Sequence, residues 1–162
     1  MTILENQPFW LRYSPLALIL ASAGALGFAY SAQLVDGLEP CVLCLYQRVP
    51  FAVVLVLGLI GQFKPSTLNW VLPLAGAVFL VGCGIAFYHV GVEQQWWQSS
   101  CGGDLAGNMS TSDLMAQLQN KPPKACDELE WTLFGISMAT YNVVYSLGLA
   151  VFCLAGALKL RK

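Results

Sequence analysis

The chain has 162 residues, of which 57% are hydrophobic and 10% are charged, and its mean hydropathy is +0.62. Soluble domains carry about 25% charged residues on average, so this composition favours a membrane protein. The formal net charge of -1 says nothing about nucleic acid, and because no basic cluster argues for it, we expect no nucleic-acid partner.

Four apolar stretches predict an all-α, polytopic membrane protein, because a hydrocarbon core of about 30 Å takes about 20 helical residues. Segments 13–35, 65–92 and 131–158 contain no Asp, Glu, Lys or Arg. Only 15 residues lie between Arg48 and Lys64. As a helix they rise about 22 Å, so that span must begin before Arg48. We therefore expect one domain, a four-transmembrane-helix bundle with spans at about 13–35, 43–63, 66–91 and 133–158.

The first apolar stretch has a second interpretation, as a cleaved secretory signal. Ala29-Tyr30-Ser31 offers the small-x-small pattern of a cleavage site. The stretch is longer than the apolar region of a typical signal, however, and Arg12 alone makes a weak basic region. A membrane span is the favoured interpretation.

Cations indicate the orientation of the bundle, because Lys and Arg are enriched in short cytoplasmic flanks. Most of them fall on one side of the four expected spans: Arg12, Lys64, Lys159, Arg161 and Lys162. We therefore expect both termini to be cytoplasmic and segments 36–43 and 93–130 to lie outside.

The segment 93–130 is the one long polar stretch and forms the expected loop between the third and fourth spans. Ser110 to Asp113 matches the S/T-x-x-D/E capping pattern, with an apolar helical face after it. A short helix on the membrane surface would bury that face, and so would docking onto a partner.

The six cysteines divide into two classes. Cys83 and Cys153 lie inside apolar runs, where cysteine packs as a small hydrophobe. The other four map to the outer side: Cys41, Cys44, Cys101 and Cys126. Pro40 precedes the C-x-x-C pair, and its fixed φ suits the start of a helix.

Three interpretations compete for the four outer thiols. Structural disulfides persist in oxidising compartments and suit Cys101 with Cys126, but a bond between Cys41 and Cys44 would constrain little. A closed zinc site of four cysteines usually contains two close pairs, which the second pair does not provide, and we expect no metal. A redox relay is the third, because cysteines at a helix N-terminus have a depressed pKa and the thiolate attacks disulfides.

Arg48 favours the redox interpretation, because an ionisable group within a span is costly and is a functional-site hypothesis by default. It lies four residues after Cys44 and seven after Cys41, so all three side chains share roughly one helix face. The alternative is an arginine that extends to the interface. A guanidinium beside a thiolate would also donate hydrogen bonds to a flat, apolar electron acceptor, and a quinone in the bilayer fits that description.

Three features together resemble the bacterial disulfide bond formation protein B family: the segment Pro40-Cys41-Val42-Leu43-Cys44-x-x-x-Arg48, the four-span layout and the cysteine pair in the outer loop. The resemblance covers essentially the whole chain. It implies a protein-dithiol:quinone oxidoreductase of the bacterial inner membrane, with its active cysteines in the periplasm. Such enzymes reoxidise a periplasmic thioredoxin-fold thiol oxidase and pass two electrons to ubiquinone or menaquinone, a system known to keep the periplasm oxidising.

The resemblance also implies roles for individual residues. Cys41 and Cys44 become the quinone-proximal pair, with Cys44 forming a thiolate–quinone intermediate that Arg48 assists. Cys101 and Cys126 become the shuttle pair. The partner's thiolate attacks their disulfide and joins Cys101, which leaves Cys126 to attack the Cys41–Cys44 disulfide.

Two further residues have two interpretations each, and a third departs from the pattern of some relatives. His89, the one histidine of the chain, either relays a proton to reduced quinone or is an ordinary interfacial or hydrogen-bonded histidine. Met138, in Trp131-x-x-Phe134-Gly135-x-x-Met138, either lines the quinone pocket or packs in the core. Gln47 stands where some relatives carry glutamate, so a charged neighbour of Arg48 is not implied there.

Two other functions remain open. Vitamin K epoxide reductase–like proteins also place a C-x-x-C motif beside a quinone in a four-helix bundle, but at a later span. From another class, the chain would be a non-catalytic membrane scaffold or small transporter with structural disulfides. Failure to reduce a soluble quinone analogue, when supplied with a reduced thioredoxin-fold partner, would favour that last function.

Overall fold

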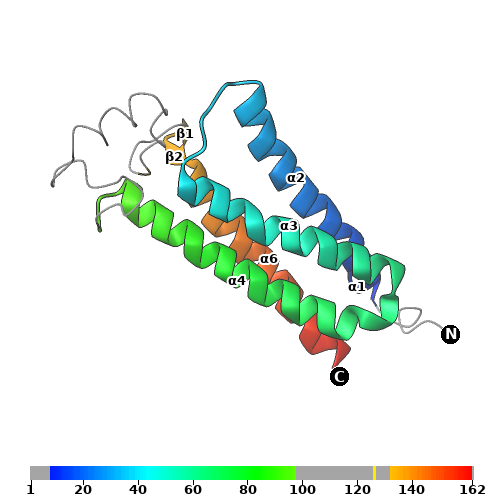
Figure 1. Cartoon of the computed structure of the whole chain (residues 1–162). Coiled ribbons are helices and arrows are strands. Elements are labelled where there is room, and N and C mark those ends of the chain that lie inside the picture. The colour runs from blue at the N-terminus through cyan, green and yellow to red at the C-terminus, as the bar shows by residue number, and fades with distance from the viewer. Residues whose placement is uncertain (1–7, 98–125, 127–131, 162) are drawn as a thin grey trace, which may run out of the picture.

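Helices make up most of the part of the chain that the computed structural model describes, namely residues 8–97, 126 and 132–161. The expected all-α architecture with four long helices is confirmed (Figure 1). In chain order the elements are α1 (Phe9–Arg12), α2 (Ser14–Leu34), α3 (Val42–Phe63), the 3-10 helix η1 (Pro65–Thr67), α4 (Leu68–Glu93), β1 (Thr132–Leu133), β2 (Ile136–Ser137) and α6 (Met138–Leu160).

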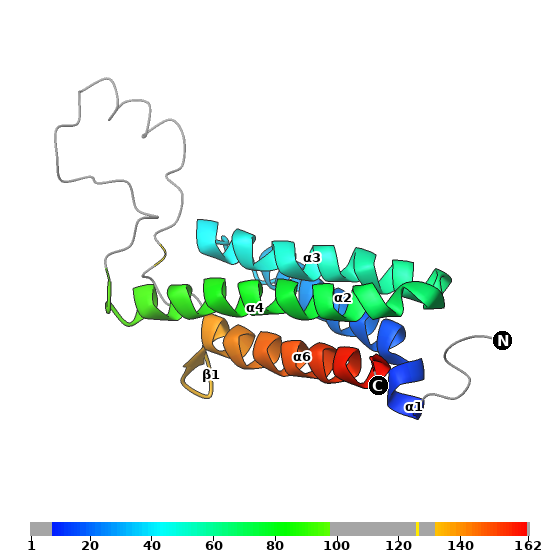
Figure 2. The same cartoon turned by 90° about the horizontal axis from the view of Figure 1, so that it is seen from below.

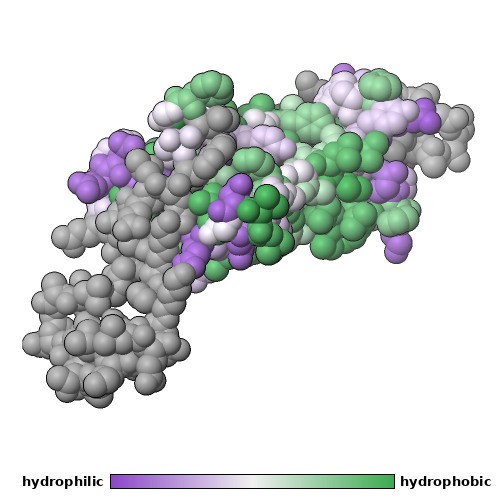
Figure 3. All heavy atoms as spheres, turned by 90° about the horizontal axis from the view of Figure 1, so that it is seen from above, coloured by the Kyte–Doolittle hydropathy of each residue, from purple (hydrophilic) through white to green (hydrophobic). Residues whose placement is uncertain are grey.

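Four of these helices are long and apolar enough to cross a membrane: α2, α3, α4 with η1 before it, and α6. The 21 residues of α2 rise about 31 Å, close to the thickness of a hydrocarbon core. Large apolar side chains such as Leu20, Trp70 and Val144 point away from the protein. Figure 3 shows this hydrophobic surface between more hydrophilic ends. The chain is therefore a multi-pass membrane protein.

The helices pack with α4 between α3 and α6, and with α2 against α3 (Figure 2). The core between them contains Phe51, Phe79, Leu72 and Cys153, all buried. Cys153 thus packs as a small hydrophobe, as expected for a cysteine within an apolar run.

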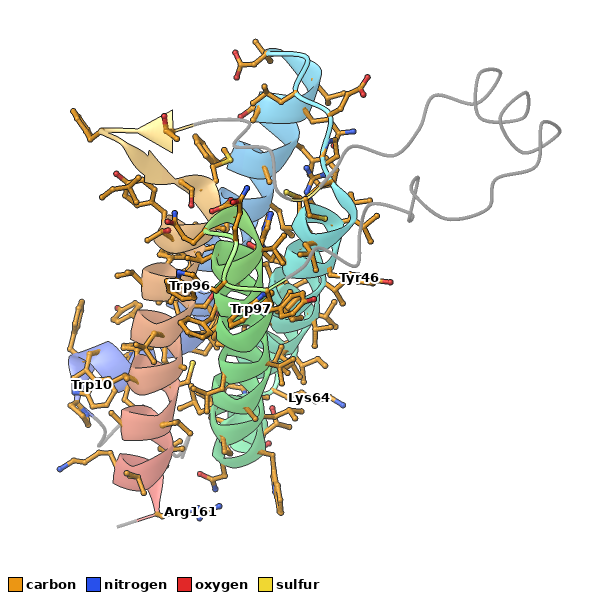
Figure 4. All side chains as sticks on the ribbon, turned by 90° about the vertical axis from the view of Figure 1, so that its left-hand side faces the viewer. Trp10, Tyr46, Lys64, Trp96, Trp97 and Arg161 are labelled. Carbon is orange, nitrogen blue, oxygen red and sulfur yellow. The ribbon has the colours of Figure 1, made fainter. Side chains whose placement is uncertain are left out.

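The two ends of the bundle differ in character. The start of α3, the end of α4 and the β1–β2 hairpin meet at one end, which we call the thiol end (Figure 1). At the other end, the cationic end, lie α1 and the last turn of α6. Figure 4 shows Lys64 and Arg161 there, away from the hairpin. Lys64 and Arg161 therefore lie away from the C-x-x-C motif, whereas Arg48 follows that motif in α3.

The helix that carries Arg48 begins at Val42, so the expectation that this span starts before Arg48 is correct. The start of the fourth long helix differs from the expected position near residue 133, because α6 begins only at Met138. Phe134 and Gly135 have φ values of 53° and 76°, as in the two-residue turns that close β-hairpins. Ser137 then caps α6, since its Oγ accepts a hydrogen bond from the Thr140 N–H at 3.3 Å.

Candidate active site

The C-x-x-C pair lies at the N-terminus of α3. Cys41 is the N-cap residue, and its Sγ accepts a hydrogen bond from the Cys44 N–H at 3.3 Å. The Cys41 thiol in turn donates to Cys44 Sγ, with 2.9 Å between the two sulfurs. Cys44 therefore lies in the first helical turn, where unpaired N–H groups and the helix dipole stabilise negative charge.

The two sulfurs of this pair are not equivalent. The pKa of Cys41 is raised to about 12, first by the hydrogen bond that its thiol donates to Cys44 and then by burial. Cys41 therefore keeps its proton at neutral pH, and the expectation of a depressed pKa is wrong for this member of the pair. Because that proton points at Cys44 Sγ, it stabilises negative charge on the Cys44 sulfur, the expected site of electron release.

Cys126, one member of the expected shuttle pair, lies against the C-x-x-C pair. It is 1% exposed and belongs to a small buried cluster with Cys41, Leu43 and Val92, against which Cys44 also packs. The fold thus brings together cysteines that are far apart in sequence. Cys101 lies outside the described residues, as does the segment with the expected capping pattern at Ser110 to Asp113.

Arg48 is held inside the bundle by α2. Its Nη1 donates to Gln33 Oε1 at 2.7 Å and its Nη2 to the Ala29 carbonyl at 3.3 Å. The guanidinium also lies over the Tyr30 ring, 4.7 Å from its centre. Its buried Nε has no hydrogen-bond partner among the described residues. These contacts oppose the alternative of an arginine that extends freely to the interface.

His89 is buried beside the C-x-x-C pair, at 5% exposure. Its Nε2 lies 3.7 Å from Cys41 Sγ and 3.8 Å from Glu93 Oε1. Its Nδ1 is 2.6 Å from Gln47 Nε2. The ring therefore connects the thiol pair to polar groups inside the bundle and is not an interfacial side chain.

The sequence patterns did not indicate that Gln47 belongs to a buried polar network with Asn142 and Ser146. Gln47, 7% exposed, accepts a hydrogen bond from Asn142 Nδ2 at 2.5 Å. The Oδ1 of Asn142 accepts one from Ser146 Oγ at 3.0 Å. The available signal was Asn142, an amide within the uncharged stretch 131–158. Polar residues in spans usually hydrogen-bond across helices.

The site residues surround one cavity of about 490 Å³, within the range of small-molecule sites. Side chains from α2, α3, α4 and α6 line it, including the aromatic rings of Phe28 and Phe51. Residues singled out from the sequence contribute to this lining, among them Cys41, Cys44, Gln47, Arg48, His89 and Met138. The cavity therefore combines an apolar wall, a dithiol pair and a cation.

A metal ion fits the same residues less well. The ligand atoms of Cys41, Cys44 and His89 lie within 4.8 Å of one another. Two thiolates on tetrahedral zinc, however, stand roughly 3.8 Å apart, given a Zn–S distance of about 2.3 Å. The 2.9 Å between the two sulfurs is shorter than that separation.

Comparisons with known proteins match most of the chain. The family model described as Disulfide bond formation protein DsbB matches residues 11–156. The Disulfide bond formation protein B of Xanthomonas campestris pv. campestris is 33% identical over 150 residues, which cover 88% of this chain and 87% of the relative. The protein of that name from Albidiferax ferrireducens is 33% identical over 148 residues, 83% of each chain. That from Xylella fastidiosa is 32% identical over 140 residues, covering 82% of this chain and 81% of the relative.

Proposed function

Because the chain belongs to the DsbB family of disulfide bond formation proteins, we propose that it oxidises a periplasmic thioredoxin-fold thiol oxidase and passes the two electrons to a membrane quinone. Membership makes the chain a thiol oxidoreductase. The identities of the protein partner and of the electron acceptor are what we propose. The observation that carries them is the cavity in which the Cys41–Cys44 pair faces apolar walls and Arg48.

In the proposed relay, each disulfide exchange makes one S–S bond and breaks another. A thiolate of the partner attacks the Cys101–Cys126 disulfide, joins Cys101 and releases Cys126. The partner's second thiol displaces Cys101 and completes the partner's disulfide. Cys126 attacks Cys41 of the Cys41–Cys44 disulfide, its neighbour in the buried cluster, and releases the Cys44 thiol. Cys101 then attacks Cys126, which forms the Cys101–Cys126 disulfide again and releases the Cys41 thiol. Two electrons and two protons thereby move from the partner to the Cys41–Cys44 dithiol.

The residues around the cavity fit a quinone. Its rings are flat and apolar, as the aromatic wall requires, and its carbonyl oxygens accept hydrogen bonds. The buried Arg48 Nε has an unused N–H for such an oxygen. His89 holds a proton near the thiol pair, and Met138 contributes an adaptable apolar surface. Ubiquinone or menaquinone, when bound, would accept the two electrons and two protons of the dithiol.

The direct test supplies purified protein with a reduced thioredoxin-fold oxidase and a soluble quinone analogue. We expect the absorbance of the quinone to fall while the partner becomes oxidised, one quinone for each partner disulfide formed. Oxidation of the partner without quinone reduction would disprove the acceptor. Loss of both activities in a folded sample would leave a membrane scaffold or transporter as the better description.

Replacing Arg48 by leucine is expected to raise the KM for quinone roughly 10- to 100-fold, because hydrogen bonds from a charged donor contribute about 1.5–3 kcal/mol. Arg48→Lys keeps the charge but loses the planar fork and should recover only part of the affinity. The rate should be measured against quinone concentration. Arg12→Leu, in α1 at the cationic end, is the control and should retain the normal KM. An unchanged KM in Arg48→Leu would exclude a quinone contact.

We also propose that the thiol end faces the periplasm of a bacterial inner membrane and that both termini are cytoplasmic. The cations at the opposite end support this orientation. A cysteine introduced at exposed Asp36 should react with a membrane-impermeant maleimide in intact cells, above the background of the native cysteines. A cysteine at exposed Lys64 should react only after lysis. The reverse pattern would invert the topology.

A further inference from the structure

We propose that Asn142 is a positioning residue that acts through Gln47 to keep the proton of His89 on Nε2, facing the Cys41 sulfur and the cavity. The consequence for electron transfer rests on the proposed function. The position of the proton does not, because it follows from the hydrogen bonds alone.

The hydrogen bonds that link Ser146, Asn142, Gln47 and His89 run in one direction. Ser146 Oγ donates to Asn142 Oδ1 at 3.0 Å, which leaves the Asn142 NH₂ group to donate to Gln47 Oε1 at 2.5 Å. The Gln47 NH₂ group therefore faces His89 Nδ1 at 2.6 Å. An amide nitrogen only donates, so Nδ1 must accept and the neutral ring carries its proton on Nε2.

The opposite edge of the ring favours the same tautomer. His89 Nε2 faces Glu93 Oε1 at 3.8 Å and Cys41 Sγ at 3.7 Å. A carboxylate only accepts hydrogen bonds, so an unprotonated Nε2 would present one lone pair to another. The other carboxylate oxygen, Oε2, is buried without a partner among the described residues. Both edges of the ring thus favour Nε2–H.

A tautomer matters here because the ring lies next to a redox sulfur. Oxidation of the Cys41–Cys44 dithiol to a disulfide releases two electrons and two protons, which the quinone accepts in the proposed reaction. Cys41 must lose its proton for the S–S bond to form. An Nε2–H beside Cys41 Sγ stabilises the negative charge that develops on the sulfur. With the proton on Nδ1 instead, the ring would offer that sulfur only a lone pair.

A purely structural network is the alternative, since buried amides commonly link membrane helices. Gln47, His89 and Asn142 do join α3, α4 and α6. Such a network would hold the helices together whichever ring nitrogen carried the proton. The position of the proton therefore separates the two interpretations.

His89 is the one histidine of the sequence, so labelling the whole protein with ¹⁵N-histidine gives a spectrum of this ring alone. In the wild type we expect a protonated Nε2 and an unprotonated Nδ1. In Asn142→Leu the Gln47 amide is free to turn, so both tautomers should be populated and the two ¹⁵N shifts should approach each other. Asn69→Leu makes the same chemical change at an exposed position of α4 and should retain the wild-type spectrum.

A second experiment measures the rate of quinone reduction by the wild type, Asn142→Leu and Asn69→Leu. Asn142→Leu should lower kcat roughly 10- to 100-fold, as when a partner that orients a metal-ligating histidine is removed, with an unchanged KM for quinone. A wild-type proton on Nδ1, an unaltered tautomer in Asn142→Leu, or an altered tautomer with a normal kcat would each overturn the proposal. If the wild type reduces no quinone but shows the expected tautomers, the proposed function fails and the assignment of the proton stands.

Discussion

Replacing Cys44 by serine is expected to abolish the transfer of electrons to quinone, with a loss of at least about a thousandfold, as is usual when a reacting group is removed. Cys44 lines the cavity and lies in the first turn of α3, where the helix N-terminus stabilises a thiolate. A serine hydroxyl neither loses electrons nor forms a disulfide with Cys41. Quinone absorbance, followed after addition of the reduced partner, measures the loss.

The Cys44→Ser protein should still oxidise its partner once. In the proposed relay the Cys101–Cys126 disulfide does not depend on Cys44, so one equivalent of partner disulfide should form before the reaction stops. Cys83→Ser is the matched control, because the Cys83 thiol donates to the Val143 carbonyl at 3.6 Å and a hydroxyl can make the same bond. The control should turn over at the normal rate. Repeated turnover by Cys44→Ser would show that electrons leave by a route other than this thiol pair.

The architecture could be predicted because it follows from composition along the chain. Apolar runs of the right length predict spans, and the short distance between Arg48 and Lys64 predicts that α3 begins before Arg48, as it does at Val42. The start of α6 was harder to place, because the residues before it are as apolar as the span. The positive φ values of Phe134 and Gly135 form the turn of the hairpin, and the cap at Ser137 starts the helix.

The surroundings of the site could not be predicted to the same extent. Sequence spacing puts Cys41, Cys44 and Arg48 on one face of a single helix, and it does not say which other helix that face meets. Gln33 holds Arg48 from α2, and Asn142 reaches Gln47 from α6. These contacts depend on the rotation and offset of neighbouring helices, which are decided by close packing and not by hydrophobicity.

The burial of the cysteines suggests the order of the relay. Cys126 is 1% and Cys41 3% exposed, and they pack together. A folded partner cannot reach either sulfur without displacing this cluster. Cys126 is thus suited to exchange with Cys41, and the partner should join the other member of the outer pair, Cys101. The last prediction follows from this asymmetry.

Cys126→Ser is expected to trap a covalent complex with the periplasmic thiol oxidase that takes up most of the added partner. In this variant the Cys101 thiolate attacks the disulfide of the oxidised partner. This attack forms the same bond between Cys101 and a partner sulfur as in the forward reaction, and it releases the other partner thiol. No Cys126 remains to displace the partner, so only the released thiol can resolve the bond. A non-reducing gel should show the sum of the two masses, and a reductant should remove that band.

Cys101→Ser is the matched variant, with the same chemical change at the other member of the pair. Its remaining thiol, Cys126, is buried against Cys41 and Leu43, and we expect no complex on the same gel. A complex in Cys101→Ser and none in Cys126→Ser would reverse the two roles. Since disulfide exchange requires the attacking sulfur to line up with both sulfurs of the bond, that result would also require the Cys126 cluster to open whenever the partner binds.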